Sequence, residues 1–179
     1  REGSAVTASN KSGLFNSYRR KFVREAQNIS HLSHPNIVSV LEVFDANNTT
    51  SYVMEYCEGG SMDGVIAEQN GLQERVALKY FTQIASALQY MHNSKMLHLD
   101  LKPGNIVMRS NEEAILIDFG LSKQYDENGN PESSTSIGGG TPGYAPTEQA
   151  DYRGDGTVFP VTMDVYALGA TLFKMLSGK

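Results

Sequence analysis

The sequence has 179 residues, of which 40% are apolar, and a formal net charge of −5, so the chain belongs among globular proteins with one sizeable core. The negative net charge and the lack of a long basic run speak against nucleic-acid binding, and the apolar stretches are too short to cross a bilayer. The single cysteine, Cys57, excludes an internal disulfide and favours a reducing, cytoplasmic setting.

The first third of the chain predicts a loop, a helix and a hairpin. Residues 1–13 are rich in Ser, Gly, Ala and Asn, a composition typical of a flexible loop. Apolar side chains recur at helical spacing over residues 15–33, and Glu25 falls within their stripe. A carboxylate there either pairs with a cation or reaches solvent from the edge of the stripe. Residues 37–44 and 51–56 are apolar, β-branched runs that predict a hairpin.

The rest of the chain predicts a mainly helical part with one more pair of strands. Ser61 can cap a short helix, and a longer amphipathic helix is expected over residues 73–93. Residues 106–108 and 114–117 predict a short strand pair. A last helix over residues 163–176 is apolar on most sides, so we expect it to be buried.

Two motifs around this second strand pair carry side chains suited to handling phosphate. The chain reads His98-Leu99-Asp100-Leu101-Lys102-Pro103-Gly104-Asn105 and, after the strands, Asp118-Phe119-Gly120. Asp100 could accept the proton of an attacking hydroxyl, and Lys102 could neutralise a transferred phosphoryl group. Asn105 and Asp118 offer the oxygen ligands that Mg²⁺ prefers. Either aspartate could instead serve an ordinary turn, but the lysine and asparagine that follow Asp100 favour the chemistry.

These motifs, together with others in the same order along residues 14–179, resemble a Ser/Thr protein kinase domain in the style of bacterial members. The further motifs are Phe22 to Ala26, His34 to Val38, Tyr52 to Tyr56, Gly140-Thr141-Pro142-Gly143-Tyr144 and Asp164 to Gly169. The resemblance implies an α+β, two-lobed fold with an incomplete small lobe and a mostly helical large lobe. The implied organisation is a partial kinase domain over 1–179, with a loop at 1–13, a partial N-lobe at 14–56, a hinge at 57–60, and a partial C-lobe at 61–179 that contains an activation segment at 118–148.

The implied function is ATP-dependent phosphoryl transfer to Ser or Thr hydroxyls of protein substrates, with ATP and Mg²⁺ as the required small molecules. Asp100 would be the catalytic base and Lys102 would contact the transferred group. In the resembled family a lysine at this position accompanies serine and threonine acceptors, so tyrosine is disfavoured. Asn105 and Asp118 would hold the metal and the nucleotide phosphates.

The resemblance also implies residues that bind adenine and residues that support the site. Met54 would set the depth of the adenine pocket, the backbone of Glu55 and Cys57 would hydrogen-bond adenine, and Val107 would form the pocket floor. Core packing explains these four side chains equally well. Structural or regulatory roles fall to Glu25, His98, Phe119, Gly120, Thr141, Glu148 and Asp164. Among them, His98 would hold the catalytic loop and Phe119 by hydrogen bonds, and Asp164 would accept backbone N–H groups of that loop.

The sequence departs from the family pattern at several places. Position 99 is Leu where many kinases have Arg, the cation that pairs with a phosphorylated activation loop. We therefore expect Ser133 to Ser136 to be at most autophosphorylation sites. No Gly-rich phosphate loop precedes Glu25, and no lysine lies on a strand that could pair with it. Because of these absences, we expect the chain to be a fragment with weak or no activity of its own.

Two other functions stay open at this point. A non-catalytic, kinase-like binding module fits the missing lysine and glycine loop, but not the complete set formed by Asp100, Lys102, Asn105 and Asp118. A small-molecule kinase of the aminoglycoside or choline type has a similar spacing of Asp, Asn and metal-binding Asp. The segment from Gly140 to Tyr144 argues against it, since that segment resembles a peptide-positioning loop.

Overall fold

The structure is a computed structural model that describes residues 23, 29–46, 49–125, 139–151 and 160–179. The chain forms two compact units. The small unit comprises residues 1–33 and 39–55, and the large unit comprises residues 34–38 and 56–179. Most of the helix expected over residues 15–33, including Glu25, lies outside the described residues. Helices and three separate two-stranded antiparallel sheets make up the described part, which confirms the α+β class.

The small unit contains the predicted hairpin, formed by antiparallel strands β1 (Val40–Ala46) and β2 (Thr49–Met54). The first strand begins later than the apolar run predicts, because the start of that run belongs to the large unit. There Ile37 forms a parallel bridge with Leu116, and the Val38 N–H donates to the Leu116 carbonyl at 3.0 Å. The apolar run is therefore shared between the two units.

The large unit contains the two predicted helices, and the longer one starts and ends within one residue of the predicted range. Helix α2 (Met62–Gln69) has the expected cap, since the Ser61 Oγ accepts the Gly64 N–H at 3.3 Å. Helix α3 (Glu74–Asn93) is the long amphipathic helix. Its buried face consists of Ala77, Tyr80, Ile84, Ala87, Leu88 and Met91. This face supplies much of the core on which the candidate site rests.

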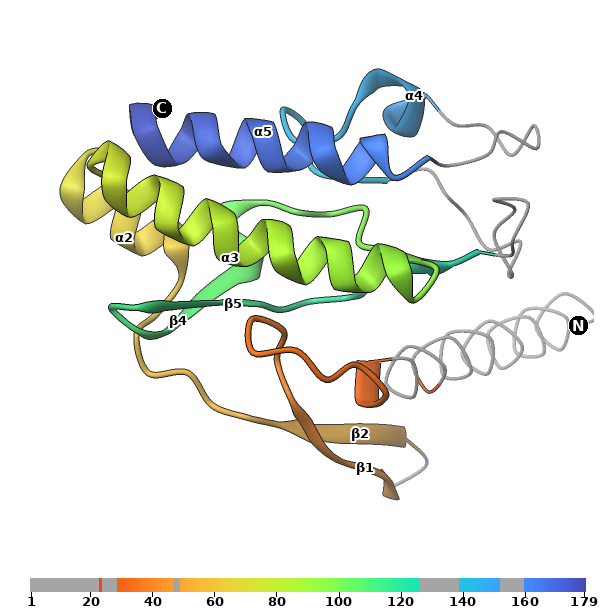
Figure 1. Cartoon of the computed structure of the whole chain (residues 1–179). Helices are drawn as coiled ribbons and strands as arrows, with labels where there is room; N and C mark the ends of the chain where they lie inside the picture. Colours follow the sequence, from red (N-terminus) through yellow and green to blue (C-terminus); the bar gives the residue numbers. More distant parts are fainter. Residues whose placement is uncertain (1–22, 24–28, 47–48, 126–138, 152–159) are drawn as a thin grey trace, which may run out of the picture. The chain divides into compact units, whose positions relative to one another are not determined.

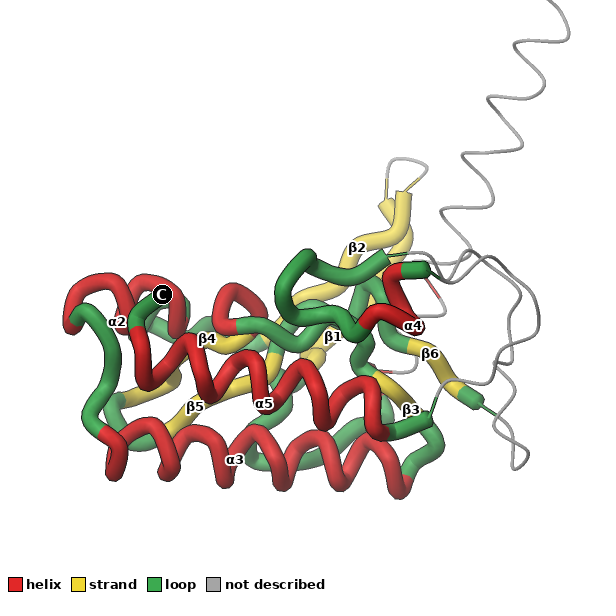
Figure 2. The backbone as a smooth tube through the Cα atoms, turned by 90° about the horizontal axis from the view of Figure 1, so that it is seen from above, coloured by secondary structure: helices red, strands yellow, loops and turns green. Residues whose placement is uncertain are grey.

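Helix α3 packs against an antiparallel neighbour, α5 (Thr162–Ser177), and against the hairpin of β4 (Ile106–Ser110) and β5 (Glu113–Leu116) (Figures 1 and 2). Polar side chains of α3 fix the hairpin. The Gln83 amide donates to the Glu112 carbonyl at 2.6 Å and accepts the Ala114 N–H at 2.8 Å. The hairpin is thus held in place at its turn and next to it, and its second strand leads directly to Asp118.

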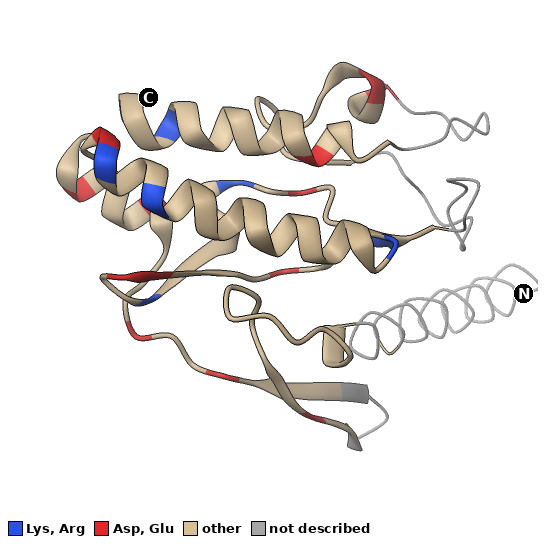
Figure 3. Cartoon of the chain, in the orientation of Figure 1, with Lys and Arg blue, Asp and Glu red and all other residues tan. Residues whose placement is uncertain are grey.

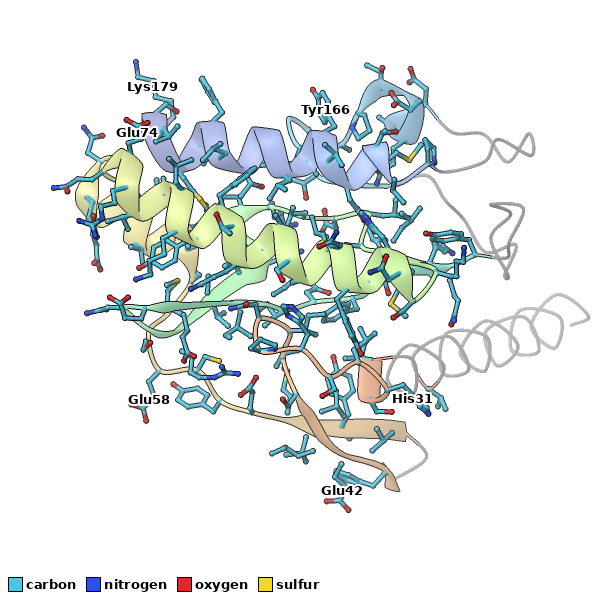
Figure 4. All side chains as sticks on the ribbon, viewed as in Figure 1. His31, Glu42, Glu58, Glu74, Tyr166 and Lys179 are labelled. Atoms are coloured by element: carbon cyan, nitrogen blue, oxygen red, sulfur yellow. The ribbon has the colours of Figure 1, made fainter. Side chains whose placement is uncertain are left out.

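The prediction that the last helix is buried on most sides is wrong for the described residues. Helix α5 buries Met163, Asp164, Ala167, Leu168, Thr171 and Met175. Its opposite side exposes Val165, Tyr166, Phe173 and Leu176, and Figure 4 shows Tyr166 projecting away from α3. The physical reason is that α3 covers only one face of α5 and no described residue covers the other. An acidic first turn and a basic last turn complement the dipole of this helix (Figure 3).

Four short elements complete the described part of the large unit around the two motifs. Strand β3 (Met96–Leu97) leads into His98 and pairs antiparallel with β6 (Lys123–Gln124), which follows the second motif. A 3-10 turn, η1 (Pro103–Asn105), ends the first motif, and helix α4 (Thr147–Ala150) follows the Gly140 to Tyr144 segment. Among the described residues, no helix is both long enough and apolar enough to cross a membrane.

Candidate active site

Asp100 lies at the centre of a hydrogen-bonded network that joins four of the predicted site residues. Its Oδ1 accepts the Thr141 hydroxyl at 2.7 Å, and its Oδ2 accepts Lys102 Nζ at 3.0 Å. The Asn105 amide donates to the same Oδ2 at 3.1 Å. Lys102 Nζ also donates to Thr141 Oγ1 at 2.7 Å. The structure therefore brings Asp100, Lys102, Asn105 and Thr141 together, although Thr141 is distant in sequence from the other three.

The local sequence explains why Lys102 and Asn105 return to Asp100. Lys102 is extended, and Pro103 then occupies the first position of the η1 turn, where its fixed φ and missing N–H cost nothing. The turn closes through the Asn105 N–H, which donates to the Lys102 carbonyl at 3.0 Å. The buried Asn105 side chain also donates to the Asp100 carbonyl at 2.9 Å. The spacing between Lys102 and Asn105 is therefore the one that a single tight turn requires.

The network keeps the Asp100 carboxyl ionised. Burial alone would raise its pKa, but hydrogen bonds from Thr141, Lys102 and Asn105 and the charge of Lys102 outweigh burial and hold the pKa below its usual value. The Asp100 side chain is 13% exposed and that of Lys102 is 27% exposed. The pair is therefore open to a molecule approaching from solvent, and Asp100 presents a negative charge to it.

His98 is buried beneath this loop as a neutral imidazole. The Asp100 N–H donates to His98 Nδ1 at 3.3 Å, so the proton belongs on Nε2, which lies 3.3 Å from the Ile117 carbonyl. Burial lowers the His98 pKa, although the nearby carboxylates, led by Asp164, act in the opposite direction. The His98 ring also lies 5.4 Å from the ring of the buried Phe119. His98 therefore connects the two motifs, through its bond to the Asp100 N–H in the first and its contact with Phe119 in the second.

Asp164 lies in the first turn of α5 and anchors the start of the predicted catalytic loop, residues 98–105. It is completely buried, and its two oxygens accept the backbone N–H groups of His98 and Leu99, each at 2.9 Å. His92 Nε2 of α3 lies 2.8 Å from Asp164 Oδ2. These three partners satisfy a carboxylate that would otherwise be costly to bury. They also tie the loop to both long helices.

Gln149 is a supporting residue that sequence reasoning missed. Its buried side-chain amide donates to the Leu99 carbonyl at 2.5 Å and to the Gly139 carbonyl at 3.2 Å. It therefore joins the Gly140 to Tyr144 region to the catalytic loop. The local sequence does not show that Gln149 is buried while its neighbour Glu148 is exposed. Glu148 accepts the Thr147 hydroxyl at 3.4 Å. The structure gives Glu148 no ion pair within the described residues.

Asp118 follows β5. The preceding residue, Ile117, donates its N–H to the Asn105 carbonyl at 2.9 Å, so the backbone before Asp118 runs beside the η1 turn. Asp118 is exposed and left-handed, with φ of 60°, and its Oδ1 accepts the Gly120 N–H at 3.1 Å. No described residue donates to Asp118 Oδ2 or to Asn105 Oδ1. A carboxylate oxygen and an amide oxygen are therefore available as the kind of ligands that Mg²⁺ prefers. Among the described residues, no group of three or more His, Cys, Asp or Glu side chains could hold a metal ion.

The residues expected to contact adenine fall in both units. Met54 and Glu55 belong to the small unit, where the Glu55 N–H donates to the Ser39 carbonyl at 3.0 Å. Cys57 and Val107 belong to the large unit, and Val107 forms an isolated bridge with Ser61.

Comparison with known proteins identifies the family. The protein kinase domain model matches residues 2–179. A probable serine/threonine-protein kinase of Clostridium perfringens is 34% identical over 89% of this chain and 22% of its own length. The serine/threonine-protein kinase PknB of Mycolicibacterium smegmatis is 33% identical, over 91% and 26% respectively. A probable myosin light chain kinase of Dictyostelium discoideum is 31% identical, over 97% and 43%. The chain spans less than half the length of these relatives, and it belongs to the protein kinase domain family.

Proposed function

We propose that this chain carries the phosphoryl-transfer site of a Ser/Thr protein kinase, which moves the γ-phosphoryl group of ATP to a Ser or Thr hydroxyl of a protein substrate. The observation that carries the proposal is the network in which Asp100 binds Lys102, Asn105 and Thr141. The names of the bacterial relatives, which are serine/threonine-protein kinases, support it.

Asp100 has room for the acceptor hydroxyl. An ionised carboxylate offers about four lone-pair positions, and three donors occupy three of them. The remaining position is on Oδ1, where a substrate hydroxyl can donate its hydrogen and be oriented for attack. Because the pKa of Asp100 is low, we infer that it takes the proton late, when the new bond to phosphorus has already made that proton acidic.

Lys102 would contact the transferred group. Its ammonium has three N–H donors, of which two bind Asp100 and Thr141. The third is available to an oxygen of the γ-phosphoryl group, whose negative charge it would stabilise. Since the same ammonium is bound to Asp100, the hydroxyl and the phosphoryl group would be held side by side. That arrangement suits the short side chains of Ser and Thr.

Asn105 and Asp118 would hold Mg²⁺ through the oxygens that no described residue occupies. The ion, when bound, supplies positive charge that neutralises the phosphates of ATP. Adenine would be bound as the sequence predicts, with Met54 setting the depth of its pocket, the backbone of Glu55 and Cys57 as hydrogen-bond partners, and Val107 as the floor. We also infer a cytoplasmic setting from the single cysteine, Cys57.

The surroundings of Leu99 support activity that does not require a phosphorylated loop. Leu99 clusters with Leu97 and Met163, and Leu121 and Tyr125 pack against them. The start of the segment after the second motif is therefore anchored by apolar contacts. The serines and threonine at 133–136 lie outside the described residues. Loss of activity after phosphatase treatment would refute this inference.

The test measures Mg²⁺-dependent ATP binding and phosphate transfer to a generic protein substrate. It compares this chain, a longer polypeptide extended at both ends, and the Asp100→Asn variant of each, with Asp151→Asn as a matched control on an exposed carboxylate. We expect transfer by the longer polypeptide, and a loss of at least about 10²-fold in Asp100→Asn but not in Asp151→Asn. If the longer polypeptide neither binds ATP nor transfers phosphate, the site belongs to a binding module.

A further inference from the structure

A single peptide group connects Leu99 to Asp100, and side chains bind both of its polar atoms. Its carbonyl, which belongs to Leu99, accepts the Gln149 side-chain amide at 2.5 Å. Its N–H, which belongs to Asp100, donates to His98 Nδ1 at 3.3 Å. Because a peptide group is planar, holding these two atoms fixes the plane from which the Asp100 side chain leaves the backbone.

The Gln149 amide fits this position closely. The residue is only 3% exposed, and its two amide hydrogens have two acceptors, the carbonyls of Leu99 and Gly139. Gly140 leaves room for the amide, because a Cβ there would lie 2.8 Å from Gln149 Nε2. The φ of Gly140 is 118°, a value that also favours glycine. Positions 140 and 149 are therefore matched to one another.

The bond from Gln149 to Gly139 closes residues 139–149 into a loop, and this loop reaches Asp100 a second time. Thr141 lies within it, and its hydroxyl donates to Asp100 Oδ1 at 2.7 Å. The closed loop therefore holds the backbone before Asp100 through Gln149, and the carboxylate itself through Thr141.

Leu99 needs this support because its backbone is left-handed, with φ of 66°. That conformation is unfavourable for a residue with a side chain, so the segment before Asp100 would rotate away from it if its bonds were lost. Asp164 holds the Leu99 N–H, and Gln149 holds the carbonyl. Both partners are unmodified side chains, so this support does not depend on phosphorylation.

We propose that Gln149 is a positioning residue for phosphoryl transfer, which orients the Asp100 carboxylate toward the acceptor hydroxyl by holding the peptide group between Leu99 and Asp100. This role rests on the proposed kinase function, since it concerns the geometry of the same carboxylate. Gln149 acts through Leu99 and touches neither ATP nor the acceptor. It should therefore affect kcat more than the KM for ATP.

The experiment uses the longer polypeptide with Mg²⁺, ATP and a generic protein substrate, at a temperature where circular dichroism shows every variant to be folded. Gln149→Leu removes both donors and keeps a similar volume. Gln149→Glu keeps the shape but turns carboxylate oxygens toward two carbonyl oxygens. Gln83→Leu is the matched control, because Gln83 is also a glutamine that binds backbone groups, those of Glu112 and Ala114.

We expect Gln149→Leu to lower kcat by about 10- to 100-fold and to leave the KM for ATP within about threefold, since a misplacement of about 1 Å can cost about 10²-fold in rate. Gln83→Leu should lower stability but keep kcat. A structural role alone predicts lower stability and an unchanged kcat for both variants.

Gln149→Glu adds a pH signature. At high pH its carboxylate cannot donate, so this variant should be as impaired as Gln149→Leu. Burial beside two carbonyl oxygens raises the pKa of the introduced carboxyl, and the proton that returns as the pH falls can donate to the Leu99 carbonyl. The kcat of Gln149→Glu, divided by that of the unsubstituted protein, should therefore rise toward low pH, and the same ratio for Gln149→Leu should not.

Hydrogen exchange without ATP gives a second readout, which does not require catalysis. The amides of Leu99 and Tyr144 lie on the two segments that Gln149 joins, and both are hydrogen-bonded. Gln149→Leu should speed exchange at these two amides relative to the amides of α3. Gln83→Leu should leave exchange at both unchanged.

The outcomes separate this role from the kinase function. If the unsubstituted polypeptide transfers phosphate and Gln149→Leu keeps its kcat, the positioning role is overturned. It is also overturned if Gln83→Leu loses as much kcat as Gln149→Leu, because the loss then follows from destabilisation. If the unsubstituted polypeptide transfers no phosphate, the kinase function fails. Faster exchange at Leu99 and Tyr144 in Gln149→Leu would then still support the bridge, and unchanged exchange would overturn it.

Discussion

Replacing Asp164 tests whether the buried carboxylate holds the catalytic loop in place. It is completely buried and accepts the N–H groups of His98 and Leu99 at 2.9 Å each, with His92 at 2.8 Å. Asp164→Ala leaves all three groups without their partner. A buried polar group that loses its partner costs about 1–3 kcal/mol. Asp164 itself is costly to bury, which offsets part of the loss, so we expect about 2–4 kcal/mol less stability.

Asp164→Asn is the more discriminating substitution. The amide keeps one oxygen acceptor with the same shape, so one of the two backbone N–H groups stays bound and the other faces an NH₂ donor. We therefore expect Asp164→Asn to lose about half as much stability as Asp164→Ala, about 1–2 kcal/mol. Either loss is a sizeable part of the 5–15 kcal/mol, roughly, that stabilises a typical domain.

The assay is urea unfolding followed by circular dichroism at neutral pH, with the unfolding free energy obtained by linear extrapolation. Asp151→Asn serves as the control, because Asp151 is exposed and its side chain binds no described residue of the network around Asp100. It should change stability by less than about 0.5 kcal/mol. If Asp164→Ala unfolds at the same urea concentration as the unsubstituted chain, or costs no more than Asp164→Asn, the anchoring argument is wrong.

Three further predictions concern the residues around this anchor. Thr141→Val removes the hydroxyl bound to Asp100 Oδ1, so the pKa of Asp100 should rise toward its usual value, and the acid limb of the pH–rate profile of the longer polypeptide should move to higher pH. Gln149→Ala should cost about 1–3 kcal/mol in urea unfolding, because the Leu99 carbonyl loses a buried donor; an unchanged midpoint would contradict this. Burial lowers the pKa of His98 in the folded chain, so the unfolded chain binds a proton on this ring more readily. The stability that the neutral ring contributes is therefore fully present above about pH 6.5 and falls as the pH drops through the lower pKa of the folded state. Urea midpoints measured from neutral to mildly acidic pH would show this fall.

The parts of the site that the sequence predicts are those that depend on local geometry. Lys102 and Asn105 return to Asp100 because a proline-led turn of three residues links them, and such a turn is visible in the order of residue types. The helix at Met62–Gln69 and its Ser61 cap are local in the same way. In each case the partners lie within a few positions of one another.

The parts that the sequence does not predict depend on contacts between distant segments. Gln149 reaches the Leu99 carbonyl across fifty positions, and its residue type alone does not distinguish it from a surface glutamine. Ile37 was expected in the β1–β2 hairpin, but it pairs with Leu116 of β5. This pairing depends on where Leu116 lies in the folded chain, which the local sequence does not show. The exposed side of α5, with Phe173, looks as apolar as its buried side, because composition does not show which face a neighbour covers.

Two residues with positive φ, Leu99 and Asp118, lie at the site, and contacts from distant parts of the large unit hold Leu99 in this conformation. Leu99 has φ of 66° and Asp118 has φ of 60°, a conformation that costs a residue other than glycine about 1–2 kcal/mol. Both polar groups of Leu99 are bound from far along the chain, the N–H by Asp164 and the carbonyl by Gln149. Contacts from α4 and α5 therefore hold the strained backbone before Asp100. The position of the Asp100 carboxylate thus depends on tertiary packing as well as on the local turn.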